Sequence, residues 1–398
     1  MNPKYLFKVK PCVIGLGYTG LPLLYEIVKY YKEYIGYDIN KKLVDKIRKN
    51  KLNVTNNIKE IEKFNFFIIC VPTPIDKFKN PDTSYIQKAF NDIKNFLKDN
   101  DTIVLESTTY PGTTRELILR SLKNKKINVG YSPERIDPGN NMDFNLIPKI
   151  ISANNKSSLK IILNFYQTIF KSVQIAKNLE EAEFAKLYEN IYRVINISLA
   201  NEMKIIAKKM NIDHNNIIEL ASSKPYGFTK FLPGPGIGGH CIPVDPFYLT
   251  WKAKEYGIHT RFIELAGEIN DSMTGWVISQ IQNYFTKKKI IPSSCLLVGL
   301  SYKKNISDIR ESPSIKLFQS FLSEMFIKCD YHDPFNSTFK INKKIYKSIN
   351  INKIKTKSYD FIVICTDHDN IDYAKIEKLS DVIFDTRNRI KSSKVIQI

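Results

Sequence analysis

A cysteine in a glycine- and proline-rich loop is the residue of this chain best suited to covalent chemistry. Cys241 stands in the run GPGIGGHCIPVDPFYL, residues 234–249, which holds four glycines and three prolines. Such a run disfavours helix and strand, so we expect an ordered loop whose backbone can approach a ligand closely. The loop would then present Cys241 and Asp245, which makes the Cys241 thiol a candidate nucleophile.

The other cysteines are expected to be buried structural thiols, because most of them lie in or beside apolar, β-branched runs. They are Cys12, Cys70, Cys295, Cys329 and Cys365. A zinc or structural role is the alternative for Cys241, but no CxxC pattern or histidine-rich partner accompanies it, so we expect no metal site. Thiols without evident pairing favour a reducing cytoplasm.

Charged side chains mark further candidate positions. Lys186 and Asn190 stand four apart in a helical pattern over residues 180–210, so both would project from one face. On spacing alone, a solvated lysine is the more common case. Glu134 and Arg135 lie between two prolines that fix their loop, although they could also be ordinary surface residues.

The N-terminal part has the elements that would hold a dinucleotide. A mostly apolar strand, residues 9–14, runs into Gly15-Leu-Gly-Tyr-Thr-Gly20 and then into a helical pattern. In this fingerprint the first glycine permits a tight turn, the second admits the pyrophosphate, and the third lets the helix pack on the strand. The next strand, residues 34–37, ends at Asp38, where a carboxylate would bind the ribose hydroxyls and favour NAD over NADP.

Polar, kinked segments follow two further strands. Strand 66–71 ends in Pro72-Thr73-Pro74, and strand 102–105 runs into a segment that contains Thr108. Because open α/β sheets bind ligands at the carboxyl ends of their strands, Thr73 and Thr108 would face the cofactor or substrate. Simple turn chemistry is the alternative, above all for Thr73. The candidate cofactor-binding residues here are Gly15, Gly17, Tyr18, Thr19, Gly20, Asp38, Pro72 and Thr73.

A second α/β unit is expected near the C-terminus, with strands at 294–298, 361–365 and 382–384. It lacks a second GxGxxG, so it should not hold another dinucleotide in the standard way. Cationic side chains at its strand ends or in the following loops suit phosphate oxygens, although each could equally be solvated. They are Lys303, Lys304, Arg310 and Arg387.

The expected fold class is α/β, with two Rossmann-like doubly wound units joined by a long central helix and a helical middle domain. We expect an NAD-binding domain over residues 1–178, a central helical domain with the cysteine loop over 179–290, and the second Rossmann-like domain over 291–398. Further helical segments are expected at about 214–222 and 249–285. The apolar stripe of the long helix suggests a homodimer surface.

The composition is that of a globular protein of 398 residues with a formal net charge of +20. The lysines are scattered through almost every segment, which is more typical of solvated faces than of a nucleic-acid or membrane patch. No signal peptide is evident, and the apolar runs are far too short to span a bilayer. A nucleic-acid-binding regulator stays an alternative, but no groove-reading motif is present, so we expect neither a nucleic-acid nor a membrane partner.

A nicotinamide site and an activatable cysteine together suggest chemistry at the aldehyde level. A thiolate can add to an aldehyde, and oxidation of that adduct leaves a thioester. The second unit, with its candidate phosphate-binding groups, indicates a nucleotide-linked substrate. A β-hydroxyacid dehydrogenase is the alternative within enzymes, but such an enzyme has no need of Cys241.

The motifs, taken in order, resemble the UDP-glucose/UDP-N-acetylmannosamine dehydrogenase family along nearly the whole chain. They are GLGYTGLPL, CVPTP, ESTTYPGTT, SPERIDPGN, AKLYEN, GPGIGGHCIPVDPFYLTWKAKEYG and GLSYKKNISDIRESPS. The cysteine loop is the most specific match, and it is similar to the branch that acts on UDP-N-acetylhexosamines, above all UDP-N-acetylglucosamine 6-dehydrogenases. UDP-N-acetylmannosamine and UDP-glucose are the alternative substrates.

The resemblance implies a four-electron oxidation of C6 of the sugar to the uronate, using two NAD and one water, for the synthesis of surface polysaccharide precursors. It implies that Cys241 is the nucleophile, that Lys186, Asn190 and Asp245 hold a water and the C6 oxygen, that Glu134 assists thioester hydrolysis and that Thr108 positions the water. Substrate contacts are implied for Arg135, Phe231, Gly238, Lys303 and Arg387, and a cofactor contact for Arg310.

One segment departs from the family pattern. Between the helix after Asp38 and the strand at Phe66 the chain is shorter than usual. The third strand of a 3-2-1-4-5-6 sheet is an edge strand, so we expect it to be the element lost, with a more open adenosine pocket.

Overall fold

The computed structural model describes residues 9–398 except 77, 123–124, 137–138, 140–142 and 240–241. The chain forms two compact units. The first comprises Met1–Asn190 and Val244–His259, and the second Ile191–Pro243 and Thr260–Ile398. Helix α6 (Leu179–Lys209) begins in the first unit and ends in the second. The three domain boundaries expected from the sequence stay a prediction.

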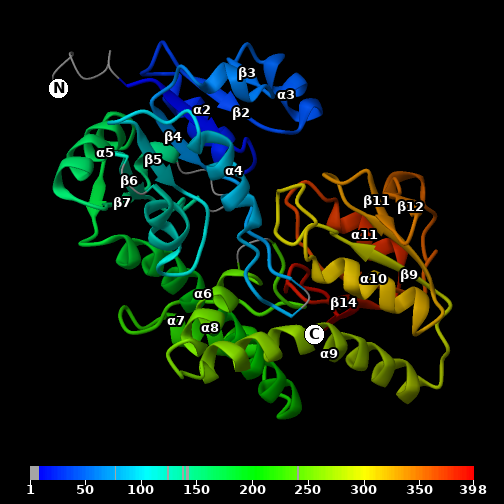
Figure 1. Cartoon of the computed structure of the whole chain (residues 1–398). Helices are drawn as coiled ribbons and strands as arrows, with labels where there is room; N and C mark the ends of the chain where they lie inside the picture. Colours follow the sequence, from blue (N-terminus) through cyan, green and yellow to red (C-terminus); the bar gives the residue numbers. More distant parts are fainter. Residues whose placement is uncertain (1–8, 77, 123–124, 137–138, 140–142, 240–241) are drawn as a thin grey trace. The chain divides into compact units, whose positions relative to one another are not determined.

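The first unit is built on an eight-stranded sheet in the order β3-β2-β1-β4-β5-β6-β7-β8 (Figure 1). The strands are β1 (Pro11–Ile14), β2 (Ile35–Tyr37), β3 (Val54–Thr55), β4 (Phe66–Ile69), β5 (Thr102–Leu105), β6 (Asn128–Tyr131), β7 (Lys149–Ala153) and β8 (Val173–Ile175). Neighbouring strands are parallel except β6 and β7. The order 3-2-1-4-5-6 is that of dinucleotide-binding folds, so the expected α/β class is confirmed.

Helices cover both faces of this sheet because successive residues of each strand point to opposite sides. In β4, Phe66 and Ile68 pack with residues of α2 (Gly20–Ile27), α3 (Lys41–Arg48) and α5 (Lys156–Ile169). The alternate residues, Phe67 and Ile69, pack with α4 (Ser84–Lys94) and the first turn of α6. The continuous apolar run of β4 is therefore the pattern of a strand buried on both faces.

The expected loss of the third strand is wrong. The shortened segment keeps β3 as a strand of two residues, paired with β2 through Gly36 N to Asn53 O at 3.0 Å and Asp38 N to Thr55 O at 3.1 Å. Val54 is buried and fills the edge of the core. The deletion has trimmed the edge strand and left its pairing in place.

The second unit contains a five-stranded parallel sheet in the order β10-β9-β13-β14-β15. The strands are β9 (Ser294–Val298), β10 (Lys328–His332), β13 (Phe361–Ile364), β14 (Ile383–Asp385) and β15 (Val395–Gln397), and a hairpin is formed by β11 (Thr338–Ile341) and β12 (Lys344–Lys347). Helices α9 (Arg261–Lys288) and α10 (Pro313–Ser323) cover one face, and α11 (Tyr373–Leu379) covers the other. This unit also contains the second half of α6 and α7 (His214–Ser222).

The glycine- and proline-rich run is a loop over only part of its length. Asp245 begins helix α8 (Asp245–Lys254), and Pro246 fits the first turn because its missing N–H would have no intrahelical partner there. The expectation of a loop to residue 249 is therefore wrong for its last five residues. Likewise, α8 and α9 divide the helical stretch expected at 249–285.

The turn after β1 recurs after β9. Leu16 N donates to Asp38 Oδ2 at 2.9 Å, and Leu300 N donates to Asp333 Oδ2 at 2.6 Å. Asp38 is half-buried, whereas Asp333 is buried and is also bonded to His368 at 3.1 Å. In both α/β units a backbone N–H of the turn after the first strand of the unit thus donates to an aspartate carboxylate. The two units differ in the burial of that carboxylate, which is greater for Asp333 than for Asp38.

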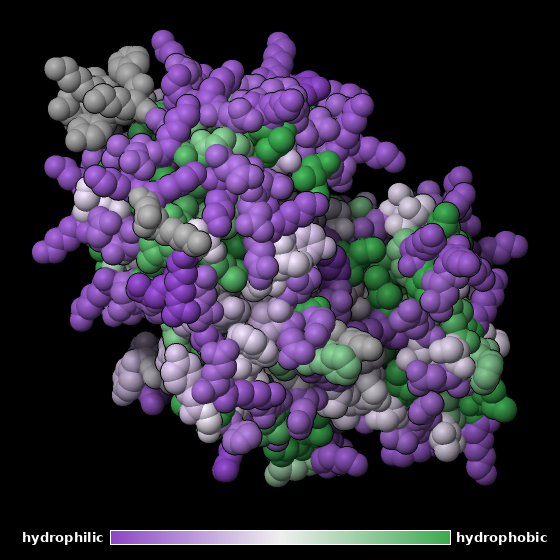
Figure 2. All heavy atoms as spheres, viewed as in Figure 1, coloured by the Kyte–Doolittle hydropathy of each residue, from purple (hydrophilic) through white to green (hydrophobic). Residues whose placement is uncertain are grey.

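Hydrophilic side chains spread over much of the face seen in Figure 2. Among the described residues, no helix is long and apolar enough to cross a membrane. The structural cysteines are buried free thiols as expected: Cys12, Cys70, Cys295, Cys329 and Cys365.

Candidate active site

The turn between β1 and α2 has the shape that a dinucleotide requires. Gly15 has φ +91°, and a Cβ on Gly20 would lie 1.9 Å from the carbonyl oxygen of Gly15. Gly17 is exposed, and a Cβ there would meet nothing within 4 Å, so this position is open on the side where a pyrophosphate would approach. The three glycines therefore fit NAD in the roles expected of them.

The other candidate cofactor residues lie around this turn and at the end of β4. Thr19 immediately precedes α2, and the Tyr18 side chain is 58% exposed. Pro72 is exposed, whereas Thr73 is buried and forms a hydrogen bond with Tyr248. The Thr73 hydroxyl thus has a structural partner, and its contact with a cofactor stays a prediction.

Helix α8 is held against the loops that follow β4 and β5. The Tyr248 hydroxyl donates to Pro74 O at 3.2 Å, and the Tyr110 ring lies 4.9 Å from that of Trp251. This packing fixes the first residue of α8, Asp245, at the carboxyl end of the sheet, where α/β proteins bind their ligands.

Three of the candidate catalytic residues meet in the first unit. Lys186 and Asn190 lie one turn apart on α6, and Asn190 Nδ2 donates to Asp245 Oδ2 at 2.5 Å. All three are buried, with exposed fractions of 7%, 5% and 2%. Burial raises the pKa of Asp245 to about 6, while the Lys186 charge and the Asn190 hydrogen bond oppose that rise. Lys186 interacts electrostatically with Asp245, so the two opposite charges lie in one buried group.

A buried carboxylate ties the loop after β5 to the same helix. Glu183 accepts hydrogen bonds from Gly112 N at 2.6 Å and from Thr114 N and Oγ1 at 2.8 and 2.7 Å. Burial raises the pKa of Glu183 to about 7, although these hydrogen bonds lower it. Glu183 lies three residues before Lys186, so the segment that carries Thr108 is anchored beside the lysine. Sequence reasoning missed Glu183 because a glutamate near a helix start usually faces solvent.

Tyr131 lies within electrostatic reach of three carboxylates of the first unit. Its hydroxyl is buried at the end of β6 and has no hydrogen-bond partner among the described residues. Burial raises its pKa, and the charges of Glu183, Asp245 and Glu106 raise it further. These carboxylates therefore surround one tyrosine.

Glu134 and Arg135 follow β6 and have separate partners. Glu134 Oε1 accepts from Arg135 N at 2.6 Å and Ile136 N at 2.9 Å, and Glu134 Oε2 is 2.9 Å from Lys149 Nζ. The Arg135 guanidinium binds both carboxylate oxygens of Glu189, at 2.5 and 3.1 Å. Arg135 is thus committed to a neighbour on α6, and its contact with substrate stays a prediction.

In the second unit, the glycines of the cysteine loop allow close packing against protein. A Cβ on Gly238 would lie 2.5 Å from Tyr302 Cβ and 2.8 Å from Glu311 O. Gly239 N donates to Arg310 O at 2.9 Å. These two glycines therefore let the loop pack closely against the segment that carries Lys303 and Arg310. From the sequence, the glycines are expected to let the backbone approach a ligand, whereas here they approach protein.

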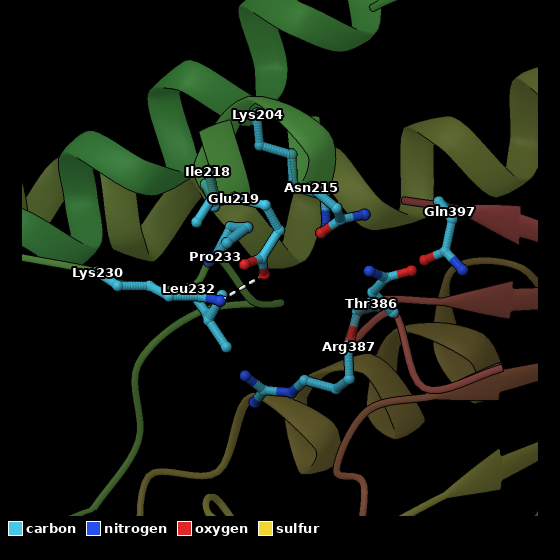
Figure 3. A pocket seen from close by; sticks show the side chains of 11 residues that line it. Lys204, Asn215, Ile218, Glu219, Lys230, Leu232, Pro233, Thr386, Arg387 and Gln397 are labelled. Carbon is cyan, nitrogen blue, oxygen red and sulfur yellow. Dashed lines mark hydrogen bonds and ion pairs between the residues drawn. The ribbon is translucent and has the colours of Figure 1, made fainter. Parts of the chain in front are cut away.

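Arg387 and its surroundings form a cationic cavity of about 200 Å³ within this unit (Figure 3). Its walls come from α6, α7, the segment 230–233, the residues after β14, and β15. Arg387 and Lys230 contribute positive charge, Glu219 is paired with Lys230, and Lys204 donates to Ile398 O. Burial lowers the pKa of Lys204 to about 7, and the Arg387 charge lowers it further. This concentration of positive charge suits an anion.

The loop that carries Lys303 is held by a histidine. His368 Nδ1 accepts from Asn305 N at 2.9 Å, so the His368 Nε2 hydrogen points to Asp333 Oδ2. Arg310, whose cofactor contact was implied by the resemblance, forms a bidentate pair with Asp308. The Phe231 ring packs edge-on against Tyr192, with the ring centroids 5.8 Å apart. Cys241, the candidate nucleophile, lies outside the described residues.

A dinucleotide turn and a buried lysine, asparagine and aspartate in the first unit, together with a second α/β unit, indicate an NAD-dependent oxidoreductase. Family models for the NAD binding, central and UDP binding domains of the UDP-glucose/GDP-mannose dehydrogenase family match residues 47–170, 180–272 and 296–392. The chain belongs to this family and is a UDP-sugar dehydrogenase.

Similar relatives fall into two groups by the name of their substrate. A UDP-N-acetyl-D-glucosamine 6-dehydrogenase from Salmonella typhi is 35% identical, with 91% of this chain and 90% of the relative covered. A UDP-N-acetyl-D-mannosamine dehydrogenase from Methanocaldococcus jannaschii is also 35% identical, with 95% and 92% covered. A solved UDP-N-acetyl-mannosamine dehydrogenase from Staphylococcus aureus has a TM-score of 0.82 at 28% identity, with 97% of each chain covered.

Proposed function

We propose that this enzyme oxidises C6 of a UDP-N-acetylhexosamine, with UDP-N-acetylglucosamine as the foremost candidate, to the uronate. The observation that carries the proposal is the buried group of Lys186, Asn190 and Asp245, whose aspartate follows Cys241 by four residues. Relatives of equal identity act on UDP-N-acetylmannosamine according to their names, so that sugar is the alternative, with UDP-glucose next.

The residues of the site would divide the reaction into steps. The Lys186 ammonium would stabilise negative charge on the C6 oxygen, because a buried cation interacts strongly with a developing alkoxide. The Cys241 thiolate would add to the carbonyl carbon of the aldehyde and form a hemithioacetal, which becomes a thioester on the second oxidation. NAD, held by the glycine turn and Asp38, supplies the acceptor for both hydrides.

Hydrolysis would then release the product. A water held by Thr108 would lose a proton to Glu134 as its oxygen bonds to the thioester carbon. The C–S bond breaks, Cys241 leaves as thiolate, and the sugar is released as a carboxylate. Two NAD and one water are consumed for each alcohol oxidised.

The nucleotide end of the substrate would be bound by the second unit. Arg387 and Lys303 would contact the diphosphate, and Phe231 and Gly238 would contact the UDP-sugar. The cavity beside Arg387 supports this assignment because the Arg387 guanidinium lines it, and the carboxylate of Glu219 among its described lining residues is already paired with Lys230. Arg135 is proposed to contact the sugar side, and Arg310 the cofactor.

The assembly is proposed to be a homodimer formed through α6. Apolar side chains recur along this helix at spacings of three, four and seven residues, and each is more than 40% exposed: Phe184, Tyr188, Tyr192, Leu199, Met203 and Ile206. A stripe of this size is more typical of a protein contact than of a solvated helix. The five buried free thiols support a cytoplasmic setting, and the uronate is proposed to serve the synthesis of surface polysaccharide precursors.

A panel of UDP-sugars tests the proposed reaction. We expect the highest kcat/KM with UDP-N-acetylglucosamine and two NADH for each sugar consumed. Cys241→Ala should release no uronate and give, at most, one NADH per sugar, because only sulfur can carry the second oxidation to a thioester. Cys329→Ala, which removes a buried thiol of β10, is the matched control and should keep two NADH per sugar. Carboxylate formation with two NADH by Cys241→Ala would overturn the mechanism.

A further inference from the structure

A buried ion cluster stands behind Glu134, the residue proposed to assist hydrolysis. Lys149 Nζ lies 2.9 Å from Glu134 Oε2 and 2.8 Å from Glu106 Oε2. Lys149 and Glu106 are 2% and 1% exposed, so bulk water does not solvate their charges. The charged groups of a buried ion pair hold each other in place, because removing one of them would leave an uncompensated buried charge that destabilises the folded protein.

The topology of the sheet brings Lys149 to this position. Glu106 follows β5 and Glu134 follows β6, so both lie at the carboxyl ends of parallel strands. Strand β7 runs antiparallel to β6, with Tyr131 opposite Ser152. The first residue of β7, Lys149, therefore lies at the edge of the sheet where β5 and β6 end, which is the edge that carries the site.

The hydrogen bonds of Glu134 leave its carboxylate with little freedom. A carboxylate has about four acceptor positions, two on each oxygen. On Oε1 both positions are taken, by Arg135 N and Ile136 N, and on Oε2 one is taken by Lys149. Among the described residues, one acceptor position of Oε2 remains.

The charges in the cluster do not balance, because one lysine serves two carboxylates. Burial raises the pKa of Glu106, and the Glu134 charge raises it further while Lys149 lowers it. Burial lowers the pKa of Lys149, but the two carboxylates outweigh it and raise that pKa to about 12. The other titratable groups of the described residues that interact with the cluster are Cys70, Tyr131 and Tyr166, and the Tyr166 hydroxyl donates to Glu106 Oε1. Lys149 therefore stays a cation throughout the working range of an enzyme.

We propose that Lys149 is a positioning residue for thioester hydrolysis, which fixes the Glu134 carboxylate and aims at the hydrolytic water the acceptor position of Oε2 that the described residues leave open. The inference rests on the proposed function, in which a proton passes from that water to Glu134 as the C–S bond of the Cys241 thioester breaks. The proton then returns to the thiolate or to solvent, so no further reactant is needed. The oxidation steps do not use Glu134, so Lys149 should govern hydrolysis and leave both oxidations fast.

Lys149→Met tests the proposal with UDP-N-acetylglucosamine, UDP-N-acetylmannosamine and NAD as the probes. Methionine fills the same space without the charge. We expect a burst of two NADH per active site and then a steady state slower by about tenfold or more, since general-base assistance contributes at least that factor. Intact-protein mass spectrometry should find a sugar adduct on Cys241. The acidic limb of the steady-state rate should move to higher pH, because Glu134 without its cation takes up a proton more readily.

Two companion variants keep the test decisive if Lys149→Met folds poorly. Lys149→Arg keeps the charge and should restore most of the hydrolysis rate. Glu106→Gln removes the competing carboxylate, so Lys149 would stabilise the Glu134 anion more strongly and the acidic limb should move to lower pH. Opposite shifts of the pH profile in Lys149→Met and Glu106→Gln are not expected from a lysine that only supports the fold.

Lys252 provides the matched control. It also bridges two carboxylates in the first unit, at 2.9 Å from Glu116 and 2.8 Å from Glu255. Lys252→Met should lower stability without an adduct and without a shifted acidic limb. The proposal is overturned if Lys149→Met turns over without a burst or an adduct, or if its acidic limb coincides with that of the wild type. Wild-type enzyme that makes no NADH from either sugar would instead overturn the proposed function.

Discussion

Replacement of Asp333 by asparagine should destabilise the second unit and loosen the loop that carries Lys303. Asp333 Oδ2 accepts from Leu300 N at 2.6 Å and Ser301 N at 3.1 Å. Its Oδ1 accepts from Phe335 N at 2.8 Å and Asn336 N at 2.9 Å. Asparagine has one acceptor oxygen, so in either orientation its NH₂ group faces two backbone N–H groups, which then lose their acceptor.

The magnitude follows from the burial of this site. Asp333 is 3% exposed, so water cannot replace the lost acceptor. Each unsatisfied buried N–H costs about 1–3 kcal/mol, which gives about 2–6 kcal/mol for Asp333→Asn. Burial alone would raise the pKa of Asp333, but the bonds from His368 and the backbone outweigh it and hold the pKa well below its usual value. The carboxylate is therefore stabilising above its unfolded pKa of about 4, and the difference between wild type and variant should shrink as the pH falls below that value.

Asp360→Asn is the matched control for this loss. Asp360 Oδ2 alone accepts from Ser293 N, Ser294 N and both serine hydroxyls, at 2.7 to 3.1 Å. Asparagine can keep its oxygen there and turn its NH₂ group to water, since Asp360 is exposed. We expect a cost below about 1 kcal/mol.

Urea unfolding at pH 7, followed by fluorescence, measures both costs. The chain has two tryptophans, Trp251 in the first unit and Trp276 in the second. A Trp251→Phe background therefore reports on the second unit through Trp276. Asp333→Asn should also raise KM for the UDP-sugar more than KM for NAD. Equal costs for Asp333→Asn and Asp360→Asn, or a cost below about 1 kcal/mol for Asp333→Asn, would refute the reasoning.

Further predictions concern the cofactor turn, the hydrolytic base and the assembly. The Asp38 carboxylate should repel a 2′-phosphate by several kcal/mol, so kcat/KM for NAD should exceed that for NADP by more than about 100-fold, and equal values would contradict the assignment. Gly20→Ala should abolish NAD binding and lower the melting temperature, because the new Cβ would lie 1.9 Å from Gly15 O, and unchanged NAD affinity in a binding titration would count against it. Glu134→Gln should accumulate the thioester, visible by intact-protein mass spectrometry, and rapid release of uronate would exclude its proposed role. Wild-type protein should sediment as a dimer at micromolar concentration and Leu199→Glu should favour the monomer, whereas a monomeric wild type would sink the dimer proposal.

The sequence predicted β1, β2, β4, β5, β9, β13 and β14 because their signals are local, but it did not predict β6, β7, β8, β10, β11, β12 or β15. Strands such as β4 and β5 are short apolar runs, and the turn at Gly15 is followed by a helix, so each element could be recognised from its own residues. The two residues of β3 were missed because their pairing depends on Asn53 and Thr55 meeting the neighbouring β2, and two residues carry no periodicity. Helix α8 was placed too late because Pro246 was interpreted as a breaker, whereas proline is compatible with a first turn.

The residues of the candidate site could be predicted from the sequence only where their spacing along the chain or the family resemblance pointed to them. Lys186 and Asn190 are one helical turn apart in any α-helix, so their common face followed from the sequence. Lys149 could not be found in this way, since one more lysine in a lysine-rich chain carries no signal. Its burial follows from strand pairing that brings it beside Glu106 and Glu134, which are distant in sequence.

This enzyme uses NAD and a UDP-sugar in each turnover, so NAD must not occupy the UDP-sugar site and the UDP-sugar must not occupy the NAD site. The repeated turn achieves this without losing the acidic residue: the carboxylate of Asp38 remains accessible to a ribose, while that of Asp333 is already saturated by its own loop and His368. Excess NAD therefore finds no free ribose acceptor at Asp333, and we expect it not to compete with the UDP-sugar at this turn. Converting that unit into a second NAD site would require several coordinated replacements, because freeing Asp333 alone would leave the backbone N–H groups of Leu300 and Phe335 without acceptors.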